Sequence, residues 1–208
     1  MLDCSRNAVF TVEKVKFLIR TLAKLGMNVL MLYTEDTYEV EGQPYFGAYR
    51  GKYTKDEIKE LDAYASMFGV ELVPCIQTLA HLHNVLKWPG MDKIRDSADI
   101  LQPEKEETYQ FIEKLLSAVK ESFSTNRVHL GMDEAVMLGL GNYLKENGYK
   151  KGSLIIREHC NRVVDICRKL ELKSMIWSDM YITANSTGGT MICPKTQTAP
   201  NGKNRKKI

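Results

Sequence analysis

Strand-like and helix-like apolar patterns alternate along this chain, and this alternation limits the folds that it can adopt. Five short apolar segments are typical of buried strands: residues 1–4, 28–33, 71–76, 127–132 and 173–177. Apolar stripes of helical spacing fall between them, at residues 12–25, 54–68, 103–119 and 154–170. Repeated strand–helix units of this kind build a parallel sheet. The chain is therefore predicted to be an α/β protein.

Two local signals mark where helices should begin. Thr54-Lys55-Asp56-Glu57 is a capping-box pattern, so a helix is predicted to start directly after Thr54. Pro103 suits the first turn of a helix, where its missing N–H costs nothing, so another helix is predicted to include it.

Periodicity alone does not choose between an open, doubly wound sheet and a closed barrel, but the residues that follow each strand favour the barrel. Polar and aromatic side chains come directly after the second to fifth strands: Thr34, Glu35, Asp36 and Tyr38; Gln77, Thr78, His81 and His83; Asp133 and Glu134; Trp177, Ser178 and Asp179. Active sites of (β/α)₈ barrels are assembled at these strand ends. Only five strands can be read, so we expect an incomplete (β/α)₈ TIM-type barrel over residues 1–181. The remaining residues, 182–208, read as a basic, disordered tail.

Two adjacent carboxylates, Asp133 and Glu134, follow the fourth strand. If side chains alternate along this strand, Asp133 shares one face with His129 and Gly131, and Glu134 can turn over the same cavity. Two crowded carboxylates cannot both ionise freely, so one of them is expected to hold a proton near neutral pH. The alternative is a solvated acidic pair at a helix N-terminus, and these two residues alone leave it open.

The whole pattern His-x-Gly-x-Asp-Glu at residues 129–134 resembles the signature of glycoside hydrolase family 20, the β-N-acetylhexosaminidases. Four further segments are similar to strand-end motifs of that family and follow in its order: residues 2–6, 33–36, 76–81 and 177–180. The residues of these segments are most similar to those of the bacterial, cytoplasmic-type branch of the family. The Arg-Gly pair that usually precedes the first motif would lie upstream of Met1, so its sugar-binding arginine is expected to be absent.

The resemblance implies a retaining reaction in which the substrate's own 2-acetamido oxygen attacks the anomeric carbon. Glu134 would act as general acid and then general base. Asp133 would accept the acetamide N–H and offset positive charge on the intermediate. The other implied substrate-binding residues are Asp36 and His81, a polar chain behind the acid, Trp177, a wall of the acetamido pocket, and His129 and Asp179. The implied partner is a terminal N-acetylglucosamine or N-acetylgalactosamine of an oligosaccharide or glycoconjugate, with no cofactor.

Each residue also has a structural interpretation. Trp177 could be core, His129 a hydrogen-bonded structural histidine, and either Asp36 or Glu35 a loop cap. Arg6 is expected to tie the first strand to neighbouring acids. Four aromatic residues follow the second strand, and they either stack on a sugar or pack their loop: Tyr38, Tyr45, Phe46 and Tyr49. The alternative function is a non-catalytic barrel remnant that binds sugar weakly, because the later strands of the family cannot be located.

Charge and composition exclude several other classes. The formal charge is +3, but five of the basic residues lie in the acid-free stretch 195–207, and the body carries 24 basic against 26 acidic side chains. We therefore expect no nucleic-acid partner, and no apolar run is long enough for a membrane span. Five irregularly spaced cysteines indicate reduced thiols and a cytoplasmic location. His81-Leu82-His83 has too few partners for a metal site. Exposed edges of the sheet favour a homodimer.

Overall fold

The sheet of this protein contains five parallel strands in chain order. A computed structural model describes residues 1–6 and 8–182. The strands are β1 (Leu2–Asp3), β2 (Val29–Tyr33), β3 (Glu71–Cys75), β4 (Arg127–His129) and β5 (Lys173–Met175). Their order in the sheet is β1-β2-β3-β4-β5, and every neighbouring pair is parallel. The predicted parallel sheet is confirmed, and the predicted tail lies outside the described residues beyond Ile182.

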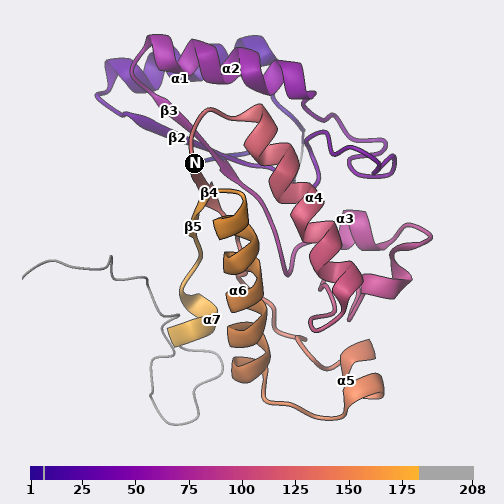
Figure 1. Cartoon of the computed structure of the whole chain (residues 1–208). Helices are drawn as coiled ribbons and strands as arrows, with labels where there is room; N and C mark the ends of the chain where they lie inside the picture. The colour runs from indigo at the N-terminus through magenta and orange to yellow at the C-terminus, as the bar shows by residue number, and fades with distance from the viewer. Residues whose placement is uncertain (7, 183–208) are drawn as a thin grey trace, which may run out of the picture.

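Four long helices connect the strands and run along one side of the sheet (Figure 1). They are α1 (Val12–Lys24), α2 (Lys55–Met67), α4 (Glu106–Ser122) and α6 (Gly152–Lys169). Consecutive long helices contact each other, as the right-handed strand–helix–strand crossover requires. Shorter helices interrupt the loops: α3 (His83–Leu86), a 3₁₀ turn (Met91–Ile94), α5 (Asn142–Asn147) and α7 (Asp179–Ile182). None of the described helices is long and apolar enough to cross a bilayer.

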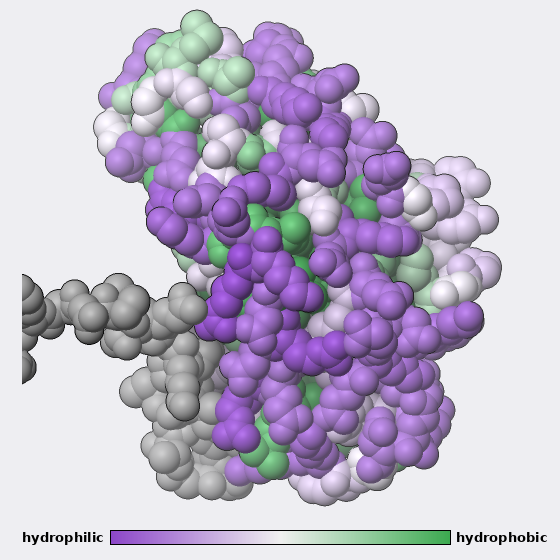
Figure 2. All heavy atoms as spheres, in the orientation of Figure 1, coloured by the Kyte–Doolittle hydropathy of each residue, from purple (hydrophilic) through white to green (hydrophobic). Residues whose placement is uncertain are grey.

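The core lies between the sheet and the long helices. Alternate strand residues such as Leu30, Leu32 and Val128 pack there against buried helix residues such as Ile19 and Leu115. The opposite faces of α4 and α6 carry polar side chains, and this side of the molecule is mainly hydrophilic (Figure 2). Burial of one apolar stripe per helix is therefore what holds the layers together.

The start of α2 agrees with the prediction from local sequence, and the start of α4 does not. Thr54 accepts the Glu57 N–H while the Glu57 carboxylate accepts the Thr54 N–H, so the predicted capping box is confirmed. The prediction for Pro103 is wrong, because α4 begins only at Glu106. Glu104 takes a left-handed φ of 69°, which a helix cannot contain, so Pro103 lies in the preceding turn.

One fully buried histidine joins α6 to the strand ends. The two ring nitrogens of His159 lie 3.2 Å from Tyr109 Oη and 2.9 Å from the Thr78 carbonyl oxygen. The second contact requires Nε2 to donate, so the neutral ring accepts from Tyr109 at Nδ1. Thr78 in turn donates through Oγ1 to the Leu130 carbonyl oxygen. Burial lowers the pKa of His159 to about 4, so it is neutral in the folded protein at pH 7.

We expect the protein to become less stable as the pH falls, because the unfolded chain then protonates His159 more readily than the folded protein does. Its folded pKa of about 4 lies below the unfolded value, so the unfolded chain binds the extra proton, and stability present above about pH 6.5 is lost as pH falls toward 4. The loss attributable to His159 is roughly 3 kcal/mol. Urea unfolding of wild type and His159→Gln at a series of pH values measures it. The variant should be less stable at pH 7.5 yet lose less on acidification, and parallel pH profiles would contradict the assignment.

Candidate active site

Hydrogen-bond register sets the ends of all five strands at one level. Asp3 pairs with Tyr33, Tyr33 with Cys75, Cys75 with His129, and His129 with Met175. The next backbone bonds continue the ladder, since Thr34 N–H donates to the Cys75 oxygen and Leu130 N–H to the Met175 oxygen. Residues that follow the strands by one or two positions therefore meet at a common edge, as active-site residues of βα barrels do.

A histidine lies between the two adjacent carboxylates. His81 Nε2 is 3.3 Å from Asp133 Oδ2 and 3.7 Å from Glu134 Oε2. The contact with Asp133 raises the pKa of His81, although burial opposes the change. The sequence predicted a raised pKa for one of the two crowded carboxyl groups, but the pKa of Asp133 is lowered, because His81 and Gln77 contact it. The Glu134 side chain is 74% exposed, so its carboxylate is accessible to a bound molecule.

Asp133 is fixed by a chain of buried side chains. Gln77 Nε2 donates to Asp133 Oδ1 at 2.9 Å and to Tyr33 Oη at 3.0 Å. Tyr33 donates in turn to Glu35 Oε1 at 3.1 Å. Burial raises the pKa of Asp133, but the contacts with His81 and Gln77 outweigh it, and the net pKa lies below the ordinary value. Asp133 is therefore an oriented carboxylate anion at neutral pH.

The backbone after β4 turns sharply to make room for this chain. The predicted strand to Met132 is wrong, because β4 ends at His129 and both Gly131 and Met132 have left-handed φ values, 71° and 68°. The Met132 N–H donates to Gln77 Oε1 at 3.2 Å. A Cβ on Gly131 would stand 2.0 Å from the same Gln77 oxygen. Only glycine allows this approach.

Gly131→Ala is accordingly expected to lower the free energy of unfolding by roughly 2–4 kcal/mol, because left-handed strain and overpacking add. Gly69→Ala is a matched control, since Gly69 ends α2 with a similar φ of 67° and nothing lies within 4 Å of an added Cβ. It should lose only the strain energy, about 1 kcal/mol. Urea unfolding compares the two variants, and equal losses would show that the Gln77 contact does not matter.

Backbone strain is concentrated at the same place. Non-glycine residues rarely adopt a positive φ. Four of the described residues that do so lie in this cluster: Glu35, His81, Met132 and Glu134. Such strain persists only where surrounding contacts impose it, and it is typical of functional sites.

Trp177, His129 and Asp179 stand beside the acid pair. The His129 and Trp177 rings lie 4.6 Å apart, and Trp177 is 39% exposed, so it is not a core residue. His129 Nδ1 accepts the Gly131 N–H at 3.1 Å, and burial lowers the pKa of His129, so this ring is neutral at pH 7. Asp179 Oδ2 accepts the Glu134 N–H at 3.1 Å and holds the backbone of Glu134 in place.

Asp36 was expected to lie with His81 in a polar chain behind the acid, but Glu35 is the residue that lies there. Arg6 Nη2 lies 3.4 Å from Glu35 Oε1 and 3.4 Å from His81 Nδ1, so Glu35 reaches the histidine through Arg6. Burial raises the pKa of Glu35, and Arg6 opposes this rise. Asp36 is buried and pairs with Arg50 at 3.0 Å. The expectation that Arg6 ties the first strand to neighbouring acids is confirmed.

The sequence predicted that Glu35 and Gln77 lie at strand ends but indicated no role in the site for them or for Tyr33. A usable signal existed for Gln77 alone, because an uncharged polar residue directly after a buried strand requires a buried partner. Among the described residues, no group of three or more histidines, cysteines or acids is arranged to hold a metal ion.

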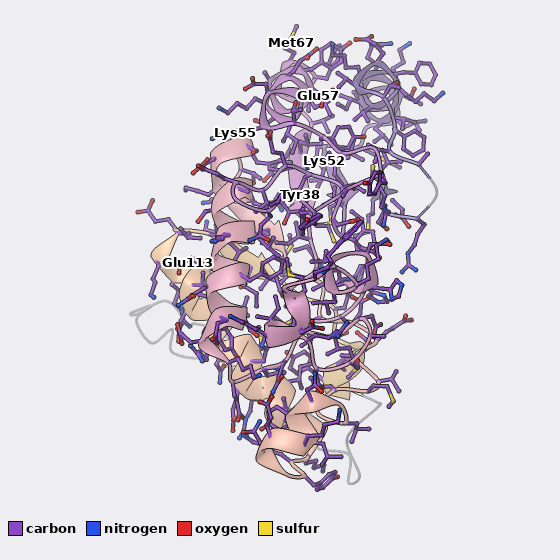
Figure 3. All side chains as sticks on the ribbon, turned by 90° about the vertical axis from the view of Figure 1, so that its right-hand side faces the viewer. Tyr38, Lys52, Lys55, Glu57, Met67 and Glu113 are labelled. Atoms are coloured by element: carbon purple, nitrogen blue, oxygen red, sulfur yellow. The ribbon has the colours of Figure 1, made fainter. Side chains whose placement is uncertain are left out.

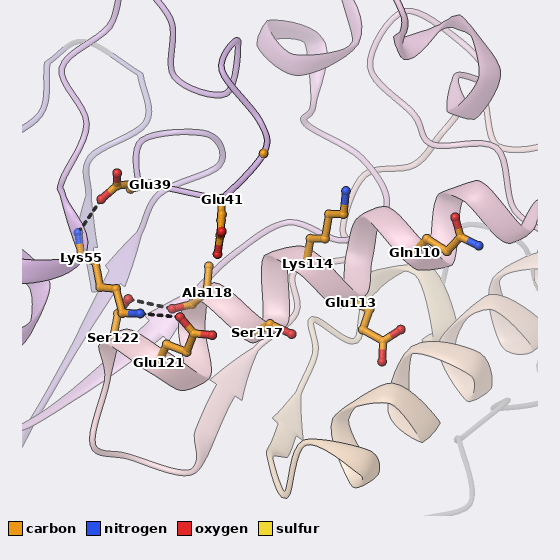
Figure 4. A pocket seen from close by; sticks show the side chains of 11 residues that line it. Glu39, Glu41, Lys55, Gln110, Glu113, Lys114, Ser117, Ala118, Glu121 and Ser122 are labelled. Atoms are coloured by element: carbon orange, nitrogen blue, oxygen red, sulfur yellow. Dashed lines mark hydrogen bonds and ion pairs between the residues drawn. The ribbon is translucent and has the colours of Figure 1, made fainter.

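A hollow of about 840 Å³ lies elsewhere, on the outer side of α4. Its lining includes Glu39, Lys55, Glu113, Lys114 and Glu121. Figure 4 shows Lys55 bridging Glu39 and Glu121 across it. No member of the acid cluster lines this hollow, and its alternating charges are those of a solvated helix face. We place the chemistry at the strand ends.

Fold and site together define an α/β barrel-type protein with an acid pair at the carboxyl ends of its strands. The sequence profile described as "Glycosyl hydrolase family 20, catalytic domain" matches residues 1–201, so the chain belongs to this family. It is 28% identical to hexosaminidase D of Bos taurus, over 75% of this chain and 48% of that protein. It is 28% identical to a beta-hexosaminidase of Vibrio furnissii, over 64% of this chain and 28% of that protein. The chain thus spans less than half the length of these relatives.

Solved structures agree on the fold. A family 20 exo β-N-acetylglucosaminidase from Vibrio harveyi superposes with a TM-score of 0.75 at 22% identity, over 90% of this chain and 36% of that chain. A β-N-acetylhexosaminidase from Bacteroides fragilis also gives 0.75, at 21% identity, over 90% and 42%. The expected (β/α)₈-type fold is confirmed, with five of its βα strands in the described residues.

Proposed function

We propose that this chain carries the acid pair of a β-N-acetylhexosaminidase that removes terminal N-acetylglucosamine or N-acetylgalactosamine with retention of configuration. The observation that carries the proposal is the contact of His81 with both Asp133 and Glu134 at the strand ends. Membership of glycosyl hydrolase family 20 supports it. Residues 1–181 would form the catalytic unit.

The two carboxylates are suited to different tasks in this reaction. Glu134 is exposed, so it can approach the leaving oxygen, protonate it, and later accept a proton from water. His81 beside it would support this exchange of protons. Asp133 is an oriented anion with a low pKa, so it can accept the acetamide N–H and offset positive charge as the acetamido oxygen attacks. Trp177 and His129 would wall the acetamido group, and Asp179 would position Glu134 through its backbone.

Hydrolysis of a chromogenic β-N-acetylglucosaminide by the purified chain tests the proposal. Cleavage that falls by about 10²–10³-fold in Asp133→Asn supports it. Absence of cleavage together with absence of N-acetylglucosamine binding would refute it, and binding without cleavage would favour the weak sugar-binding alternative.

We expect turnover of the 208-residue chain to be slow. Glu134 is 74% exposed and Trp177 is 39% exposed, so water reaches the acid and the acetamido wall. Water raises the effective dielectric constant and weakens electrostatic stabilisation of the transition state. Initial rates on the chromogenic substrate should give a kcat below about 1 s⁻¹, the lower end of the usual enzyme range. A kcat within that range would show that the described strands enclose the site better than these exposures indicate.

We also propose a cytoplasmic location. The four described cysteines, Cys4, Cys75, Cys160 and Cys167, are free and buried, as in proteins of reducing compartments. Fractionation of the source cells tests it, and recovery in a secreted fraction would contradict it.

A further inference from the structure

Three aromatic residues form a platform in the loops that follow β2 and β3: Tyr45, Tyr49 and the half-buried Trp88. The Tyr45 ring lies nearly parallel to the Trp88 ring, with centroids 5.1 Å apart and an interplanar angle of 19°. Tyr49 flanks Trp88 at 6.0 Å with an angle of 37°. The two tyrosines are 47% and 98% exposed. Large exposed aromatic rings that gather in one place mark binding surfaces more often than isolated ones do.

The segment that carries the tyrosines is anchored by its other two aromatic residues. Tyr38 and Phe46 are buried and meet edge to face at 5.1 Å, and Phe46 also packs on Phe111 of α4. Lys52 donates to the Phe46 carbonyl oxygen at 2.9 Å, and Figure 3 shows Lys52 close to Tyr38 in this view. Packing of the loop therefore explains why residues 38 and 46 are aromatic and buried. It does not explain why Tyr45 and Tyr49 face solvent.

Asp36 ties the platform to the acid cluster. Its carboxylate pairs with Arg50, the neighbour of Tyr49, and attracts Lys87, the neighbour of Trp88. Asp36 also directly follows Glu35, which reaches His81 through Arg6. Both platform segments follow the carboxyl ends of β2 and β3, the edge at which the acids lie.

The loop that carries the tyrosines packs closely against the backbone of Asp36. A Cβ on Gly47 would stand 2.6 Å from the Asp36 carbonyl oxygen, and the Tyr53 N–H donates to the Thr37 oxygen. The loop that carries Tyr45 and Tyr49 is therefore fixed against the segment that follows the carboxyl end of β2.

We propose that this platform binds the leaving-group side of the substrate, the sugar next to the terminal residue in a β-linked N-acetylhexosamine oligosaccharide. The proposal rests on the function proposed above. A pyranose ring presents flat faces of C–H groups, which stack on aromatic rings, while its hydroxyl groups stay in water. The face of Tyr45 that is turned away from Trp88 supplies the flat surface, and Trp88 supports that ring from behind. Arg50 and Lys87 beside them supply donors for sugar oxygens.

The chain offers a direct readout because it contains only two tryptophans, Trp88 on the platform and Trp177 in the acid cluster. Fluorotryptophan labelling of the full chain gives two ¹⁹F resonances, which Trp88→Phe and Trp177→Phe assign. Titration with N-acetylglucosamine should shift the Trp177 resonance alone. Titration with the β-1,4-linked tetrasaccharide of N-acetylglucosamine should shift both resonances, and the shifts should reach saturation.

Tyr45→Ala should weaken tetramer binding by roughly tenfold and leave monosaccharide binding unchanged. Tyr149→Ala is the matched control, because Tyr149 is a 77% exposed tyrosine beside α5, and it should change neither affinity.

The outcomes separate this inference from the function on which it rests. A tetramer that shifts only the Trp177 resonance overturns the platform and leaves the proposed function standing. A Trp88 resonance that responds equally to the monosaccharide overturns its assignment to the leaving-group side. If neither resonance responds to either sugar, the proposed function and the platform are both overturned.

Discussion

Glu134→Gln is expected to slow hydrolysis of N-acetylhexosamine oligosaccharides by about 10³-fold, within the range that general acid catalysis contributes. Glutamine keeps the shape of the side chain, and the Glu134 N–H can still bind Asp179, but the amide cannot protonate a leaving oxygen. Activated aryl glycosides need little protonation, so their hydrolysis should be slowed much less. The measurement is kcat/KM for a disaccharide and a dinitrophenyl glycoside.

The control for this substitution is Glu107→Gln, which removes an exposed carboxylate from the first turn of α4. It should leave both rates unchanged. Equal losses on both substrates from Glu134→Gln would argue against a general-acid role.

Asp133→Asn is expected to slow both kinds of substrate by about 10²–10³-fold, since the anion that orients the acetamide and offsets its charge is lost. The same change should lower the pKa of His81 toward its ordinary value, because the contact with Asp133 is the main cause of the rise. The imidazolium would then deprotonate at a lower pH than in wild type. NMR titration of the His81 ring protons measures this, with steady-state rates on the same samples.

Asp165→Asn serves as the control for Asp133→Asn. Asp165 pairs with Arg168 on the exposed side of α6, so its replacement should change neither the rates nor the His81 titration. An unchanged His81 pKa in Asp133→Asn would contradict the contact between His81 and Asp133 at the centre of the site.

The sequence predicted the parts of this structure that depend on pattern. Apolar periodicity predicted the parallel strands and the four long helices. The order of polar residues after each strand then predicted that Asp133, Glu134, His81 and Trp177 would lie at one edge of the sheet. Both inferences need only the spacing of side chains along regular elements.

The rest depended on tertiary contacts that spacing does not encode. Glu35 and Asp36 are adjacent acids, and the left-handed φ of 37° at Glu35 decides which one faces Arg6. β4 ends early because the backbone at Gly131 packs against Gln77, a contact between residues 54 positions apart. The exposure of Tyr45 beside a buried Phe46 follows from where α4 packs, and local pattern cannot separate the two.

In the mechanism that we propose, Asp133 and Glu134 act together with the substrate's own acetamido group. The most direct test uses aryl β-N-acetylglucosaminides whose acetyl methyl group carries none, one, two or three fluorine atoms. Fluorine withdraws electrons and weakens the acetamido oxygen as a nucleophile, while the leaving group stays the same. We predict that kcat/KM of the wild-type chain falls steeply and progressively along this series. Rates that do not depend on fluorination would show that the acetamido oxygen does not attack, and would contradict the account.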